Sequence, residues 1–177
     1  WAPESIRIMT DHIARDGHRI DPSGMDTSAY MKNPVVLWRH GFDGQSAGLP
    51  IGRTIALDHS PTALVANFEF LAGDPFAARV ANAWKRGFIH AASVTWRSVQ
   101  QAPIPGGTGL HFAKSELLEW SLVPVPADPG ASRELYAAGL QAMGFADLIA
   151  TPPGPLGEGW GEGRGEGDFA GQSEAPR

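Results

Sequence analysis

The chain has 177 residues, of which 42% are hydrophobic, and this is enough for one domain with a substantial apolar core. Its formal net charge of −5 at pH 7 disfavours nucleic acid as a partner, because nucleic acid attracts basic surfaces. The absence of cysteine excludes disulfide bonds, thiolate catalysis and cysteine-ligated metal sites, and no run of about 18 apolar residues predicts a membrane span.

The first half of the chain is dominated by strand patterns. Residues 5–14 alternate between apolar and polar side chains, which predicts a half-buried strand. Residues 34–40 carry four consecutive apolar side chains and predict a buried strand, and the polar, glycine-rich residues 41–50 predict a loop. Residues 51–57 and 63–70 flank the turn sequence DHSPT, so we expect them to form a hairpin.

The second half combines strands with two predicted helices. Asp74 and Pro75 form a typical helix start, and Gly87 is a typical C-terminal cap, so a helix is expected between them. Residues 88–99 predict a strand, and residues 111–125 predict either a strand pair or one long, bent strand. Residues 131–143 predict an amphipathic helix. Short turns between strands favour a mainly β, antiparallel barrel or sandwich decorated by helices.

The composition changes after residue 150. Residues 151–177 contain eight glycines, five acidic residues and two arginines, and so few apolar side chains cannot offset the entropy of ordering the chain. We therefore expect a folded domain over residues 1–150 and a disordered tail over residues 151–177.

A serine and a histidine are the candidate catalytic residues. Ser93 lies in the strand sequence AASVTWR, and His40 ends the apolar run NPVVLWRH. Strand alternation places Ser93 and Thr95 on one face and His90 on the other, so His90 is a poor base for Ser93. His40 could act as the base only from a neighbouring strand. The serine context is not the G-x-S-x-G of the nucleophile elbow.

A metal site is the weaker interpretation of the same region. His40 and Asp43 are close in sequence, but no H-E-x-x-H or comparable ligand pair occurs. We therefore predict no metal and no other cofactor, although a metal-dependent hydrolase using these two residues remains an alternative that a chelator would test.

Several motifs together resemble the phage prohead protease family. They are, in order, NPVVLWRH, the PIGR of Pro50–Arg53, a helix ending in KRGF, AASVTWR, and ELLEWSLVPVPADPGA. Members of this family are serine proteases that cleave scaffold and capsid proteins as tailed-phage heads mature. The resemblance spans about residues 5–140, and its most specific part is Leu118–Val123 with the prolines that follow.

This resemblance implies a fold, an activity and a site. The fold would be similar to that of the herpesvirus assembly proteases, a closed antiparallel β-barrel surrounded by helices. The activity would be that of a serine endopeptidase, with Ser93 as nucleophile and His40 as general base. Glu119 is the expected third catalytic residue, and His111 is its competitor because the related viral proteases use a second histidine. A simple outward-facing strand position is an equal alternative for Glu119.

The resemblance also implies partners and a location. The expected substrates are phage scaffolding and major capsid proteins, and the expected location is the host cytoplasm, inside the assembling procapsid. Neither nucleic acid nor a membrane is an expected partner, and association into a homo-oligomer is compatible with this interpretation. The non-enzymatic alternative is an inactive β-barrel module that binds capsid or scaffold protein without cutting it.

Overall fold

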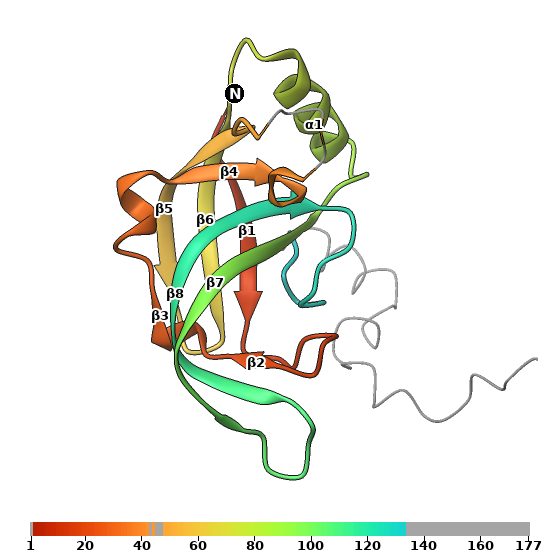
Figure 1. The fold of residues 1–177 in the computed structure, drawn as a ribbon. Coiled ribbons are helices and arrows are strands. Elements are labelled where there is room, and N and C mark those ends of the chain that lie inside the picture. The colour runs from red at the N-terminus through yellow and green to blue at the C-terminus, as the bar shows by residue number, and fades with distance from the viewer. Residues whose placement is uncertain (1, 43, 45–47, 134–177) are drawn as a thin grey trace, which may run out of the picture.

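The computed structural model describes residues 2–42, 44 and 48–133, and β-strand is the main regular structure of these residues (Figure 1). The strands of the described chain are β1 (Glu4–Thr10), β2 (Arg19–Ile20), β3 (Met25–Asp26), β4 (Val35–Trp38), β5 (Gly52–His59), β6 (Ala63–Phe70), β7 (Ala91–Pro103) and β8 (Leu110–Val123). Its helices are α1 (Pro75–Lys85) and the short 3-10 helices η1 (Pro22–Gly24), η2 (Tyr30–Lys32) and η3 (Arg39–Gly41).

The long strand β8 organises the sheet. β7 pairs with it in antiparallel fashion along almost its whole length. On its other edge β8 pairs in turn with β2, β3 and β4, all three of which run parallel to it. The strands lie in the order β1-β6-β5-β4-β8-β2, with β7 also beside β8. The sheet curves into a nearly closed barrel (Figure 1).

Two local predictions are confirmed by the structure. β5 and β6 form the expected antiparallel hairpin, and the alternate side chains of β6 from Leu64 to Phe70 are buried. Helix α1 begins at Pro75 with the Asp74 side chain accepting a hydrogen bond from the Ala77 backbone N–H at 2.6 Å. Gly87 follows the helix with a φ of 78°, the left-handed conformation that glycine adopts most easily.

The core lies inside the curved sheet and contains aromatic residues from three elements. Phe68 of β6 makes edge-to-face contacts with Trp84 of α1 and Trp120 of β8, at ring-centroid distances of 5.6 and 5.2 Å. All three side chains are fully buried. The indole N–H of Trp120 donates to Thr54 Oγ1 at 2.8 Å, so its polar atom is satisfied within the core.

The expected closed antiparallel barrel surrounded by helices is wrong for this chain. Within the described ranges there is one α-helix, and it lies at one end of the sheet rather than around it (Figure 1). Three strands run parallel to β8, and β1 and β7 do not pair, so the ladder of hydrogen bonds does not close. The physical reason is that the connections between β1 and β4 are short and contain Gly, Pro and Asp, which favour turns and 3-10 helices.

Some expectations lie outside the described residues. The predicted helix over residues 131–143 falls almost entirely there, as do the domain boundary at residue 150 and the predicted tail over residues 151–177. Among the described helices, none has the length and apolar character needed to cross a membrane.

The glycine of the PIGR motif is required by close packing between strands. A Cβ atom on Gly52 would lie 2.3 Å from the backbone oxygen of Glu69 on the neighbouring strand β6. We expect Gly52→Ala to lower the free energy of unfolding by about 1–3 kcal/mol, because the backbone must shift to relieve the clash. Thermal unfolding followed by circular dichroism would measure the effect.

Gly107 offers a matched control for this substitution. Its added Cβ would meet nothing closer than the Ile104 side chain at 3.5 Å, an ordinary contact. Gly107→Ala should therefore leave the unfolding midpoint almost unchanged. Equal midpoints for both variants would contradict the packing explanation.

Candidate active site

The candidate site is built on the outer face of the β7–β8 pair. Ser93 lies directly opposite Ser121, and Thr95 lies directly opposite Glu119, with no register shift between the two pairs. Residues directly opposite in an antiparallel pair have Cβ atoms about 5 Å apart and share one face. The neighbouring residues Ala92 and Trp120 face the core. The four polar side chains therefore form one patch on the barrel wall.

His40 reaches this patch from the turn that follows β4. β4 pairs with β8 from Val36↔Trp120 to Trp38↔Leu122, so the chain leaves β4 beside the patch. Arg39 and His40 have φ angles of 48° and 59°, the left-handed conformation that side chains with a Cβ rarely adopt. Backbone outliers of this kind cost about 1–3 kcal/mol each and concentrate at functional sites.

The imidazole of His40 contacts the carboxylate of Glu119. Nδ1 of His40 and Oε1 of Glu119 are 2.6 Å apart, and Thr95 Oγ1 lies 3.2 Å from the same nitrogen. Only 28% of the His40 side chain and 14% of the Glu119 side chain are exposed. Glu119 therefore lies on the outer face of β8, as the alternative from the sequence had it, but its side chain is mostly covered and contacts His40.

The Glu119 carboxylate is held in its charged form. Burial raises the pKa of this carboxyl group, but hydrogen bonds from His40, Thr95 and Ser121 lower it by more, so that its net pKa lies below the ordinary value. Thr95 donates to Oε1, and Ser121 donates to Oε2 at 2.8 Å. An ionised carboxylate at Nδ1 fixes the tautomer that carries its proton there, which leaves Nε2 of His40 as the basic nitrogen.

Ser93 shares the face of this pair but is not hydrogen-bonded to it. It is half-buried, one position along β7 from the Thr95–Glu119 pair on the same face. Among the described residues no hydrogen bond joins Ser93 to His40. Looser contacts between a nucleophile and its base are common before substrate binds. The structure thus brings His40, Ser93 and Glu119 to one region of the barrel wall.

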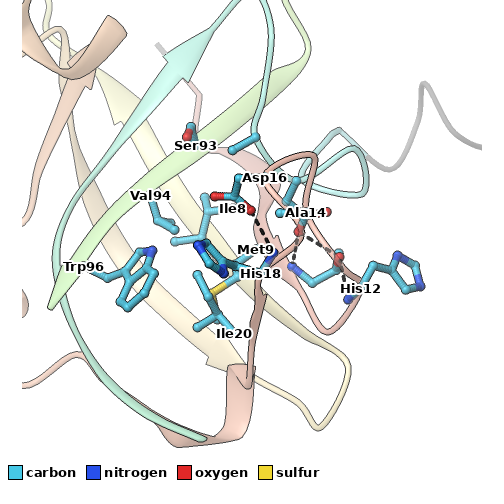
Figure 2. Close-up of a pocket in the computed structure, with 13 residues that line it drawn as sticks. Ile8, Met9, His12, Ala14, Asp16, His18, Ile20, Ser93, Val94 and Trp96 are labelled. Atoms are coloured by element: carbon cyan, nitrogen blue, oxygen red, sulfur yellow. Dashed lines mark hydrogen bonds between the residues drawn. The ribbon is translucent and has the colours of Figure 1, made fainter. Parts of the chain in front are cut away.

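A small cavity lies on the opposite side of β7. It occurs where β1 and β7 approach each other without pairing, and Val94 and Trp96 point into it while Ser93 lies at its edge (Figure 2). Its volume of about 50 Å³ has room for one or two water molecules. This cavity is too small to hold a polypeptide chain.

Of the two other candidates from the sequence, only His111 lies among the described residues, and it is placed away from this pair. His111 lies eight residues before Glu119 on β8, which corresponds to a path of about 26 Å along the strand, and it pairs with Arg19 and Ala102. Asp43 lies outside the described residues. Within the described part of the chain, no three His, Asp or Glu side chains are grouped closely enough to hold a metal ion.

Thr95 and Ser121 belong to the site although their roles were not predicted from the sequence. The available signal was strand alternation, which puts Thr95 on the face of Ser93 and Ser121 on the face of Glu119. What it could not supply was the register of β7 against β8, which sets the two pairs directly opposite each other.

Comparison with known proteins found no family model, no curated protein and no solved structure that matches this chain.

Proposed function

We propose that this protein is a serine endopeptidase that cleaves scaffold and/or capsid protein during phage prohead maturation. The proposed catalytic activity is supported by the 2.6 Å contact between His40 and Glu119, which lies on the same outer face as Ser93. A histidine whose Nδ1 is fixed by a mostly covered carboxylate, on the same face as a serine, is an arrangement suited to nucleophilic peptide hydrolysis.

The proposed mechanism follows the triad chemistry. Ser93 Oγ attacks the scissile carbonyl carbon, and Nε2 of His40 accepts the hydroxyl proton. His40 then donates this proton to the leaving amine as the peptide bond breaks, which leaves an acyl-enzyme at Ser93. Water, deprotonated by His40, hydrolyses the ester and restores the serine. Glu119 stabilises the imidazolium that forms in both steps.

The substrate class and the location rest on the motifs that resemble the prohead proteases. The proposed substrates are the scaffolding protein and the major capsid protein, and cleavage takes place in the host cytoplasm, inside the assembling procapsid. Phe42, two residues after His40, is 86% exposed and offers apolar surface to an extended chain.

Labelling with a serine-reactive fluorophosphonate tests the proposed activity without a known substrate. We expect a covalent adduct that peptide mass spectrometry places on Ser93, and we expect His40→Gln to slow its formation by at least about a hundredfold because the base is lost. A chelator should have no effect on the labelling rate. An adduct on another serine, or none at all, would contradict the proposal.

A non-enzymatic module that binds capsid or scaffold protein is the second candidate. It is favoured by one observation, which is that no hydrogen bond between Ser93 and His40 occurs among the described residues. This alternative predicts that the folded protein stays unlabelled and that Ser93→Ala leaves head assembly intact. The endopeptidase predicts labelling and, for the same substitution, uncleaved and immature heads.

A further inference from the structure

We propose that Ser121 is the positioning residue of this site. Its hydroxyl group hydrogen-bonds both to the backbone N–H of His40 and to Glu119, the carboxylate that contacts the His40 ring. This inference rests on the proposed function, because a positioning role has meaning only if His40 acts as a base. It assigns a role within the site to a residue that takes no part in the bond-making steps.

The hydroxyl of Ser121 makes two hydrogen bonds of opposite direction. Its oxygen accepts the backbone N–H of His40 at 2.9 Å, and its O–H donates to Oε2 of Glu119 at 2.8 Å. The other carboxylate oxygen, Oε1, contacts His40 Nδ1 at 2.6 Å. The backbone and the ring of His40 are therefore linked through Ser121 and Glu119 into one closed ring of hydrogen bonds.

The strained turn at His40 explains why such a restraint is needed. Arg39 and His40 both have positive φ angles, and a left-handed residue with a Cβ relaxes to the ordinary regions unless its surroundings hold it. The group that accepts the backbone N–H of His40 is the hydroxyl of Ser121 on β8. Loss of this acceptor would release the backbone that carries the base.

The burial of Ser121 supports the same role. Its side chain is completely buried although it lies on the outer face of the strand, because the His40 turn covers it. A buried hydroxyl exchanges its hydrogen bonds with solvent poorly, so its two bonds persist and keep the geometry fixed. Thr95 supports Glu119 as well, but it is exposed and does not contact the His40 backbone.

The test compares Ser121→Ala with Ser115→Ala in the full-length chain. Ser115 is the matched control because it lies on the same strand, is 1% exposed, and has a hydroxyl without a hydrogen-bond partner among the described residues. The first measurement is the rate of fluorophosphonate labelling. We expect Ser121→Ala to lower the limiting rate about tenfold to a hundredfold with little change in half-saturating probe concentration, because orientation and not binding is lost.

Two further measurements do not depend on activity. Proton NMR should show the downfield Nδ1–H resonance of His40, assigned by its absence in His40→Gln, and Ser121→Ala should broaden or shift it. The backbone amide of His40 should exchange with solvent at least about tenfold faster in Ser121→Ala than in the unsubstituted protein. If Ser121→Ala fails to fold, Ser121→Cys, which keeps the size but hydrogen-bonds weakly, should show the same changes.

The outcomes separate this inference from the proposed function. Unchanged NMR and exchange behaviour in Ser121→Ala, or equal changes in Ser115→Ala, would overturn the positioning role. If the unsubstituted protein is never labelled, the endopeptidase proposal fails, whereas the resonance and the amide exchange still decide whether Ser121 holds the His40 turn.

Discussion

Ser93→Ala is expected to reduce peptide-bond cleavage by roughly 10⁴-fold or more, because the substitution removes the atom that attacks the carbonyl carbon. Ser93 is half-buried and makes no hydrogen bond within the described chain, so the fold of the Ser93→Ala variant should be unaffected. The measurement is mass spectrometry of a defined mixture of unstructured peptides, incubated with the protein and sampled over time.

Ser98→Ala is the matched control for this prediction. Ser98 lies on the same strand with similar burial, and its hydroxyl contacts Gln101 rather than the His40 site. It should cleave the same peptides at the unsubstituted rate. If Ser93→Ala retains cleavage at the same bonds within tenfold of the unsubstituted protein, Ser93 is not the nucleophile.

Glu119→Gln is expected to lower the cleavage rate by about 10²–10⁴-fold while leaving the fold intact. The glutamine amide has nearly the shape of the carboxylate, but it carries no charge to stabilise the imidazolium. It can also present an N–H group to Nδ1, which would favour the wrong tautomer of His40. The same peptide assay measures the effect, with kcat and KM separated.

Glu116→Gln controls for the loss of a carboxylate on the same strand. Glu116 forms an ion pair with Arg97, whose side chain is 66% exposed, and such surface pairs contribute little. Its substitution should leave kcat unchanged. A similar loss of activity in both variants would show that net charge, rather than the contact with His40, explains the effect of Glu119→Gln.

The acid stability of the protein should reveal the same carboxylate. Because the pKa of Glu119 is lowered in the folded state, the unfolded state binds more protons at low pH. The stabilising contribution of Glu119 is present at pH values above its ordinary pKa of 4.5, and it is lost as the pH falls through the lowered pKa of the folded state. Chemical denaturation at several pH values should therefore show a shallower acid-side loss of stability for Glu119→Gln than for the unsubstituted protein.

The elements of this fold that could be predicted are those with a strong local pattern. The β5–β6 hairpin and helix α1 follow from alternation, from four-residue spacing and from capping residues that act over a few positions. The prediction of a closed barrel surrounded by helices was wrong. The actual strand order could not be predicted, since the pairing of β8 with β2, β3 and β4 depends on contacts between residues far apart in the chain.

The candidate site shows the same division. Alternation places Ser93 with Thr95, and Glu119 with Ser121, on common faces. The position of His40 depends on left-handed backbone at Arg39 and His40, and neither residue type signals that conformation in a sequence. The contact between His40 and Glu119 therefore comes from the structure, and the catalytic role of the three residues remains a prediction.

The β4–β8 ladder has a consequence for how this protein would lose function. Ser93 and Glu119 belong to a single hairpin, whereas His40 follows β4, which pairs with that hairpin through three parallel rungs, from Val36↔Trp120 to Trp38↔Leu122. Side-chain hydrogen bonds from Ser121 and Glu119 add to this connection. Local opening of the short β4–β8 pairing would separate His40 from Ser93 while the β7–β8 hairpin stayed paired. Inactivation on heating would then precede melting of the bulk of the domain.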